Sequence, residues 1–266
     1  MEIADVTKLY GGRGHQVRAL ARVSFQLHEG DRLGVVGESG SGKSTLARVL
    51  VALERPDAGD VRFRGRSIVG RSRSELAELH RAVQIVFQDP FGSLDPRMRV
   101  ADSIAEPLRS LAIPGDHWAR VEELLEAVGL PPGSGRMFPH QFSGGQRQRV
   151  AIARALAPKP SVLIADEAVS ALDVSVRAQV LNLVATLVER FGLTLVFISH
   201  DMTVVRHVCS RVVVLFRGQI VESGPVERVF QHPEHPYTAA LIRSVPSLGG
   251  KIEAPAAFGW TDEAPI

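Results

Sequence analysis

The chain has 266 residues, of which 45% are hydrophobic, so it can bury a sizeable core in one large or two small domains. Its formal net charge of +2 argues against the strong positive field that nucleic-acid binding uses. The single cysteine, Cys209, excludes an intramolecular disulfide and a cysteine-held cluster, and we expect it to be a small buried hydrophobe. The sequence shows neither a signal-peptide pattern nor an apolar run of about 20 residues, which predicts a soluble, cytosolic protein.

The first thirty or so residues predict short strands and turns that form an antiparallel edge subdomain. Strand patterns occupy residues 1–6 and 23–27, and a glycine-rich loop at 11–14 separates them. Tyr10, one of two tyrosines in the chain, lies on the loop side of the first strand. It is either a platform on which an adenine stacks or a half-buried core side chain.

A glycine-rich loop follows the apolar run 33–36 and opens a helical stretch at 45–52. It fits the pattern G-x-x-x-x-G-K-[ST], and its backbone N–H groups and the positive end of the helix dipole would surround an anion. We therefore expect a nucleotide site in which Lys43 reaches the β- and γ-phosphates and the Ser44 hydroxyl binds Mg²⁺. The loop, called the P-loop below, consists of Gly37, Glu38, Ser39, Gly40, Ser41, Gly42, Lys43, Ser44 and Thr45.

The remaining chain alternates strand and helix patterns, which predicts an α/β fold with a mainly parallel sheet. Strands are expected at 60–65, 83–87, 162–165, 193–198 and 211–216, and helices at 72–81, 121–128 and 174–191. Ser72 or Ser74 would cap the first of these helices, and Asp173 the last. A helical subdomain at about 89–160 interrupts the main domain of residues 1–230. The extension 231–266 is rich in Pro and Ala without a clear period, so we expect it to be partly disordered.

Gln88 follows the expected strand 83–87, and the next segment, 89–96, is dense in turn-forming residues. This segment nevertheless keeps two apolar residues, Phe91 and Leu94. Apolar side chains in such a loop predict a contact surface for another protein.

Asp166 and Glu167 end the buried strand 162–165, at the edge where open α/β sheets bind ligands. Because successive strand residues point in opposite directions, the two carboxylates should have different tasks. We expect Asp166 to hold Mg²⁺ and Glu167 to act as the general base for an attacking water. His200 ends the next strand and could hydrogen-bond a γ-phosphate, although a histidine there is more often structural.

Ser143 and Gln146 form a capping-box pattern at the start of a helix, with Gly144 and Gly145 between them. The simplest interpretation is a well-capped helix. Taken together with the P-loop motif, the exposed helix start is a second candidate anion site. Arg147 and Arg149 follow, and two arginines on a helix usually form a solvated face.

These motifs together resemble the ATP-binding-cassette (ABC) transporter ATPases in order and spacing, over nearly the whole chain. The branch most similar is that of oligopeptide, dipeptide and nickel importers, through residues 87–96 and the His-Pro-Tyr-Thr run at 235–238. The chain departs from the family at Phe142, where leucine is usual, and at 168–169, where Ala-Val replaces Pro-Thr. The iron–sulfur cysteines that some members carry near the C-terminus are missing after Tyr237.

The resemblance implies that Tyr10 stacks on adenine and that Gln88 contacts both the γ-phosphate and Mg²⁺. The loop after Gln88 would contact a membrane subunit, and Asp173 would lie at an interface with a second cassette. The segment that contacts the ATP held by that second cassette would be Ser143, Gly144, Gly145 and Gln146.

The resemblance therefore implies an ATP-binding and ATP-hydrolysing subunit that energises an importer, with peptides as the expected cargo and ATP and Mg²⁺ as cofactors. The implied partners are a second cassette, two permease subunits and, indirectly, an extracytoplasmic solute-binding protein, at the cytoplasmic face of the membrane and without nucleic acid. Alternatives are an importer of nickel or another small solute, or a cassette ATPase not coupled to transport. A P-loop kinase is a further rival, and it would yield a phosphorylated product instead of free phosphate.

Overall fold

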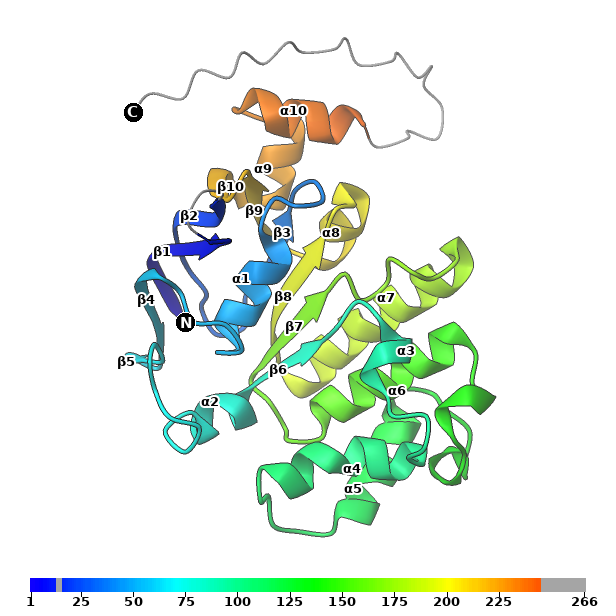
Figure 1. Ribbon diagram of the computed structural model, residues 1–266. Coiled ribbons are helices and arrows are strands. Elements are labelled where there is room, and N and C mark those ends of the chain that lie inside the picture. Colours follow the sequence, from blue (N-terminus) through cyan, green and yellow to red (C-terminus); the bar gives the residue numbers. More distant parts are fainter. Residues whose placement is uncertain (13–15, 245–266) are drawn as a thin grey trace.

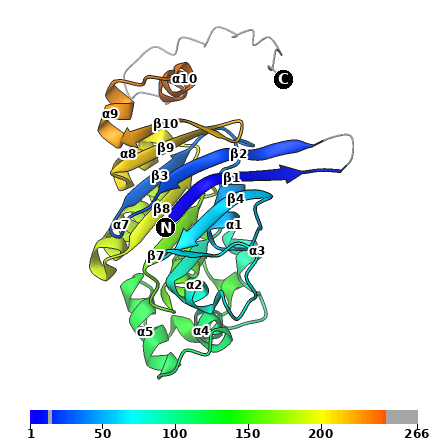
Figure 2. The ribbon, with the colours of Figure 1, turned by 90° about the vertical axis from the view of Figure 1, so that its left-hand side faces the viewer.

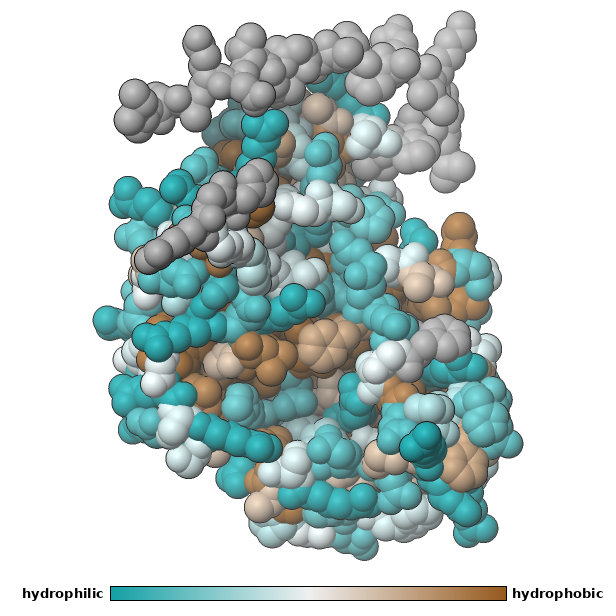
Figure 3. Space-filling view, in the orientation of Figure 1, coloured by the Kyte–Doolittle hydropathy of each residue, from teal (hydrophilic) through white to brown (hydrophobic). Residues whose placement is uncertain are grey.

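The computed structural model describes residues 1–12 and 16–244, and Figure 1 shows their arrangement. Two sheets and the helices around them form the molecule. Within the described residues, no helix is both long enough and apolar enough to cross a bilayer. The face seen in Figure 3 is mainly hydrophilic, with a band of hydrophobic residues across its middle.

The N-terminal sheet is antiparallel, as predicted, and its strand order is β2-β1-β4-β5. Figure 2 shows β1 and β2 as a long hairpin along one side of the molecule. The first strand runs as far as Tyr10, beyond the predicted end at residue 6, because it pairs with β2 over nearly its whole length. The strands are β1 (Glu2–Tyr10), β2 (Val17–Gln26), β4 (Ala58–Phe63) and β5 (Arg66–Ser67).

The second sheet is the predicted, mainly parallel one, with the order β10-β9-β3-β8-β7-β6. Only the pair β9 and β10 is antiparallel in it. The carboxyl ends of β6, β7, β8 and β3 therefore meet at one edge. The strands are β3 (Arg32–Val36), β6 (Val83–Val86), β7 (Val162–Asp166), β8 (Thr194–Ser199), β9 (Arg211–Phe216) and β10 (Gln219–Pro225).

Helices cover both faces of the parallel sheet. Helix α1 packs in a core shared by the two sheets, whereas α4, α5, α6, α7 and α8 contribute to the core on the other face. The bounds are α1 (Lys43–Leu50), α2 (Ala77–Ala82), α3 (Pro90–Ser93), α4 (Val100–Ser110), α5 (His117–Ala127), α6 (Gly144–Leu156), α7 (Val174–Phe191), α8 (Met202–Val208), α9 (Val226–Gln231) and α10 (Pro236–Arg243). Short 3₁₀ turns occupy Ser134–Arg136 and Pro139–Gln141.

The predicted cap and end of the helix at 174–191 are confirmed, and so is the burial of the single cysteine. Asp173 caps α7, because its carboxylate accepts the N–H of Val176 at 2.9 Å. Gly192 ends the same helix with a φ of 61°, which favours glycine. Cys209 is buried, and burial raises the pKa of its thiol to about 12, so it is an inert core residue as expected.

Two predictions are wrong. Helix α2 begins at residue 77 with Leu76 as its N-cap, since Ser72 instead bonds the Glu75 carboxylate in a preceding turn. Leu94 is 3% exposed and belongs to the core, so it offers no contact surface; the Phe91 side chain lies outside what the structure describes. The extension, expected to be partly disordered, contains α10 within its described part. Residues 245–266 lie outside the described chain, and the domain division stays a prediction.

Gly34 on β3 lets α8 pack directly against the parallel sheet. A Cβ at this position would lie 2.2 Å from Cγ1 of Val205, which is fully buried on α8. The sequence therefore needs glycine here for close approach and not for an unusual backbone angle.

Gly34→Ala should lower the free energy of unfolding by about 1–3 kcal/mol, the range for overpacking a core. Val205→Ala removes the clashing methyl groups, so the same Gly34→Ala change should cost less in that background. Denaturant unfolding of the two single variants and the double variant measures this coupling. An equal cost in both backgrounds would contradict the packing described.

Candidate nucleotide site

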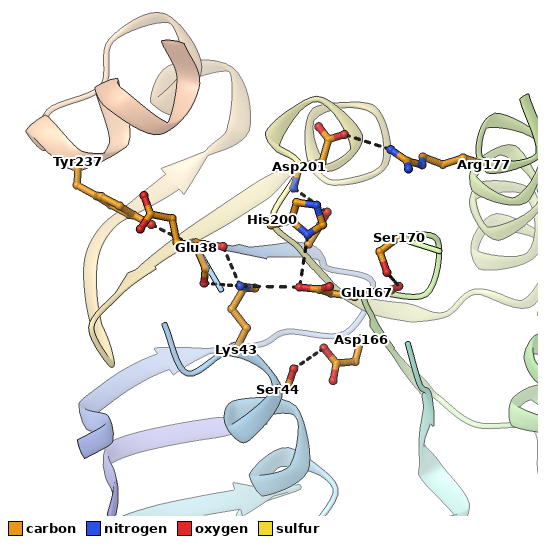
Figure 4. Close-up of polar contacts among 12 residues, drawn as sticks. Glu38, Lys43, Ser44, Asp166, Glu167, Ser170, Arg177, His200, Asp201 and Tyr237 are labelled. Atoms are coloured by element: carbon orange, nitrogen blue, oxygen red, sulfur yellow. Dashed lines mark hydrogen bonds and ion pairs between the residues drawn. The ribbon is translucent and has the colours of Figure 1, made fainter. Parts of the chain in front are cut away.

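The predicted site residues follow neighbouring parallel strands. The P-loop follows β3, His200 follows β8, Asp166 and Glu167 lie at and after the end of β7, and Gln88 comes shortly after β6. Because these strands are adjacent and parallel, their carboxyl ends bring the residues to one edge of the sheet. Figure 4 shows Lys43, Ser44, Asp166, Glu167 and His200 together there.

Two glycines let the P-loop lie against both sheets. A Cβ on Gly37 would be 2.1 Å from the carbonyl oxygen of Leu215, on β9. A Cβ on Gly42 would be 2.1 Å from the carbonyl oxygen of Ala19, on β2, and Gly42 also has a φ of 105°. The loop path thus depends on the absence of side chains at these positions.

The start of α1 has donors available for an anion. Its N-cap is Gly42, without a side-chain cap or an acidic residue in the first turn. The Ser41 hydroxyl is buried and has no hydrogen-bond partner within the described residues. Glu38, Ser39 and Gly40 form the exposed part of the loop. These groups fit a phosphate, because first-turn N–H groups and the helix dipole favour negative charge.

Lys43 is 4% exposed, and its ammonium is held by the loop itself. Nζ donates to the carbonyl oxygens of Gly37 at 2.7 Å and Glu38 at 2.8 Å, and it lies 3.9 Å from Oε1 of Glu167. Burial lowers the pKa of Lys43, and the carboxylates of Glu167, Asp166 and Glu38 act against this shift. The site therefore holds a positive charge at the point where phosphates were predicted.

Asp166 and Ser44 contact each other, as expected for two ligands of one metal. The Ser44 hydroxyl donates to Oδ1 of Asp166 at 3.2 Å. Burial raises the pKa of Asp166, which the Ser44 hydrogen bond opposes and the Glu167 charge reinforces. Among the described residues, no cluster of three or more His, Cys, Asp or Glu side chains could enclose a metal. One carboxylate and one hydroxyl fit Mg²⁺, which takes few protein ligands and completes its shell with phosphate oxygens and water.

Glu167 lies in a turn beyond the end of β7. Its φ of 46° is the left-handed conformation, which is uncommon for a residue with a side chain and often marks functional sites. Its N–H donates to Ile198, and its carbonyl accepts from the N–H and hydroxyl of Ser170. Its carboxylate faces Lys43 and His200, with 3.5 Å between Oε1 and Nδ1 of His200. Asp166 and Glu167 thus have different neighbours, as predicted. The cause is the turn at Glu167, however, and not the alternation of side-chain directions along a strand.

Tyr10 lies beside the first turn of α1. Its hydroxyl donates to the Glu54 carboxylate, and the Lys8 ammonium lies 5.6 Å from its ring centroid. Burial and then the Glu54 hydrogen bond raise the pKa of Tyr10, while a hydrogen bond with Thr45 of the P-loop lowers it. Gln88 is exposed after β6. The roles of Tyr10 and Gln88 stay predictions.

The helix start at Ser143 is formed as the capping box predicts, but away from the P-loop. The Gln146 N–H donates to the Ser143 hydroxyl at 3.3 Å, and the Ser143 N–H donates to the Gln146 side chain at 3.0 Å. Helix α6 lies on the opposite side of the parallel sheet from α1 (Figure 1). Gly145 is required for packing, since a Cβ there would lie 2.3 Å from Cγ1 of Val176 on α7, whereas Gly144 has more room.

The arginines that follow do not form a solvated face, contrary to expectation. Arg147 donates to the carbonyl oxygen of Pro139 at 2.7 Å, and Arg149 to that of Val128 at 2.8 Å. Their guanidinium groups thus satisfy backbone carbonyls of neighbouring turns.

One contact residue was not identified from the sequence. The Glu38 N–H donates to the hydroxyl of Tyr237, on α10, at 2.9 Å. In the sequence, Tyr237 stands out only as part of the His-Pro-Tyr-Thr run. The one available signal was that the chain has only two tyrosines, of which Tyr10 is the other.

The fold and this site define an ABC cassette, and comparison with known families shows that the chain belongs to the ABC transporter family. The family model described as "ABC transporter" matches residues 20–170. A second model, described as "Oligopeptide/dipeptide transporter, C-terminal region", matches residues 221–258.

Individual relatives agree with this assignment. The glutathione import ATP-binding protein GsiA of Escherichia coli (strain K12) is 50% identical over 252 residues, which are 94% of this chain and 40% of that protein. The Shigella flexneri protein of the same name has the same identity and the same coverage of both chains. The chain thus spans less than half the length of these curated relatives.

Solved structures show the same fold. A dimeric post-hydrolysis state of the ATP-binding cassette MJ0796 bound to ADP and Pi has a TM-score of 0.76 and 30% identity, covering 85% of this chain and 98% of that one. The structure of cbiO1 from Clostridium perfringens, part of the ABC transporter complex cbiONQ, also has a TM-score of 0.76, with 26% identity and coverages of 88% and 91%.

Glu222 on β10 attaches the C-terminal segment to the sheet. Its carboxylate is 7% exposed and accepts the N–H groups of Glu234 and His235, each at 3.0 Å. Burial raises the pKa of Glu222, but the hydrogen bonds from these two N–H groups and the nearby Thr238 side chain outweigh it, so the pKa lies below its usual value.

Glu222→Gln should lower the free energy of unfolding at neutral pH by about 1–3 kcal/mol, since one accepting oxygen of a charged group is lost. A lowered pKa in the folded state gives stability that is present above the unfolded-state value of about 4.3 and is lost as pH falls through the folded value. The difference between the two proteins should therefore shrink on acidification. Denaturant unfolding at several pH values tests this, and a pH-independent difference would contradict it.

Proposed function

We propose that the chain is the ATP-binding and ATP-hydrolysing subunit of an importer, and that the imported solute is a peptide. The observation that carries the proposal is one constellation: a buried Lys43 in the P-loop, the Ser44–Asp166 pair beside it, and Glu167 between Lys43 and His200. Membership of the ABC transporter family supports the same activity.

The residues divide the work by their positions. Lys43 and the N–H groups of the P-loop would bind the phosphates, and Ser44, Asp166 and Gln88 would hold Mg²⁺, which neutralises phosphate charge when it is bound. Glu167 would take a proton from the attacking water, and His200 would orient the same carboxylate or contact the γ-phosphate. Tyr10, beside Thr45, would stack on the adenine. Catalysis would come mainly from positioning and charge stabilisation, because water is the acceptor.

Two cassettes would complete each site. The Ser143 helix start lies apart from the P-loop of its own chain. Ser143 is exposed and its side chain caps only the Gln146 N–H of the first turn, so this helix start suits a nucleotide on a second cassette. The solved MJ0796 relative is described as dimeric, which supports this arrangement. ATP would favour the closed pair, and its hydrolysis would release it.

A membrane partner would convert closure into transport. Two permease chains would dock near Gln88, and a solute-binding protein would deliver the cargo on the other side of the membrane. The chain would lie at the cytoplasmic face of the membrane. The cbiO1 relative, described as part of the ABC transporter complex cbiONQ, supports an association with transporter subunits. The oligopeptide/dipeptide C-terminal region and the glutathione import relatives support a peptide as the solute.

Lys43→Ala should weaken binding of ATP with Mg²⁺ by at least about tenfold, because a charge-assisted hydrogen bond contributes about 1.5–3 kcal/mol. Isothermal titration calorimetry measures the change. Lys159→Ala is the matched control, since Lys159 is exposed and lies before β7, and it should leave the affinity unaltered. Equal affinities of Lys43→Ala and the unmodified chain would refute the phosphate assignment.

Glu167→Gln should bind ATP but release phosphate about 10²–10⁴-fold more slowly, the usual contribution of a general base. It should also accumulate as a closed pair in ATP, detectable by light scattering. Glu189→Gln, an exposed change on α7, is the control. Near-normal turnover of Glu167→Gln would exclude Glu167 as the base. ATP turnover that requires a second substrate and yields its phosphorylated form, instead of free phosphate, would indicate a kinase.

A further inference from the structure

The C-terminal segment of the described chain contacts the P-loop at its first peptide. Tyr237 extends from α10 towards Glu38, as Figure 4 shows, and its hydroxyl accepts the Glu38 N–H at 2.9 Å. Tyr237 is 6% exposed, and the hydrogen bond to the exposed Glu38 is partly buried. The bond connects residues 199 positions apart in the sequence.

The peptide unit between Gly37 and Glu38 is bonded at both of its polar groups. Its N–H donates to Tyr237, and its carbonyl, that of Gly37, accepts Nζ of Lys43 at 2.7 Å. Two bonds on opposite sides of one planar unit fix its orientation, and each polarises the other. If this peptide rotated, Lys43 would lose one of its two carbonyl partners. The position of the buried ammonium is therefore tied to the Tyr237 hydroxyl.

Tyr237 is itself held in place. Its ring packs on Phe216 of β9, with 4.2 Å between the centroids and 34° between the planes. Its own N–H donates to Nδ1 of His235, which caps α10, at 3.1 Å. Glu222 fixes the backbone just before that cap. Burial raises the pKa of Tyr237, and the hydrogen bond from the Glu38 N–H acts against this shift.

A second contact from the same part of the chain supports the P-loop. The N–H of Gly218, in the turn between β9 and β10, donates to the carbonyl oxygen of Ser41 at 3.0 Å. The exposed residues 38–40 thus lie between two supports, Tyr237 at one end and Gly218 at the other. The β9–β10 turn and α10 thus both hold the P-loop through hydrogen bonds.

We propose that Tyr237 is a positioning residue through which the C-terminal segment 222–241 presets the P-loop for nucleotide. Tyr237 fixes the Gly37–Glu38 peptide in one orientation. Through that peptide it also fixes the position of Lys43 to which the phosphates would bind. The proposal rests on the proposed function, because it concerns the affinity of the same site. A loop that is already ordered has a smaller entropic cost of binding. Loss of the Tyr237 hydroxyl should therefore weaken nucleotide binding.

Tyr237→Phe in the full chain removes the hydroxyl and keeps the ring on Phe216. Without nucleotide, backbone hydrogen exchange in peptides that span residues 37–43 should become faster, by about threefold to tenfold, as expected for one hydrogen bond. The Kd for ATP with Mg²⁺, and the KM for hydrolysis, should rise by a similar factor, while kcat stays the same. A merely structural role would lower Tm without this split between KM and kcat.

Val121→Ala is the control for stability. Val121 is 1% exposed on α5, remote from the P-loop, so the variant should lower Tm and leave both the exchange of residues 37–43 and the Kd unaltered. Unchanged exchange and unchanged or tighter ATP binding in Tyr237→Phe would overturn the proposal, as would an equal loss of affinity in Val121→Ala. If the unmodified chain fails to bind ATP, the proposed function is wrong, and the exchange measurement still decides whether Tyr237 orders the loop.

Discussion

The buried ammonium of Lys43 is the constraint around which the site is built. A charge removed from water must be paired, and here the partners are two carbonyl oxygens of the P-loop and the Glu167 carboxylate. The loop backbone is therefore curved by its own hydrogen bonds with Lys43. Such preorganisation suits a site that stabilises phosphate charge, because few dipoles need to reorient when the ligand binds.

The rest of the fold supports this pairing from several directions. Parallel strand order brings Glu167 and His200 next to the loop, and both sheets approach so closely that only glycine fits at Gly37 and Gly42. The C-terminal segment adds Tyr237 behind the first loop peptide. The region that the oligopeptide/dipeptide model matches thus contacts the P-loop directly.

Features encoded by neighbouring residues could be predicted from the sequence, and features that depend on distant contacts could not. The P-loop, the capping box at Ser143 and the parallel strands are local patterns, and they are present. Leu94 lies among turn formers but packs in the core, because helices far along the chain cover it. The left-handed Glu167 and the contact of Tyr237 with the loop depend on a tertiary arrangement that no spacing or period records.

The most direct test is a crystal structure of the chain with Mg²⁺ and a non-hydrolysable ATP analogue. The account predicts that Nζ of Lys43 donates to the phosphates while it keeps a contact with the carbonyl oxygen of Gly37, and that the Glu38 N–H stays bonded to Tyr237. An analogue bound elsewhere, or a Lys43 ammonium that contacts no phosphate oxygen of a bound triphosphate, would contradict it.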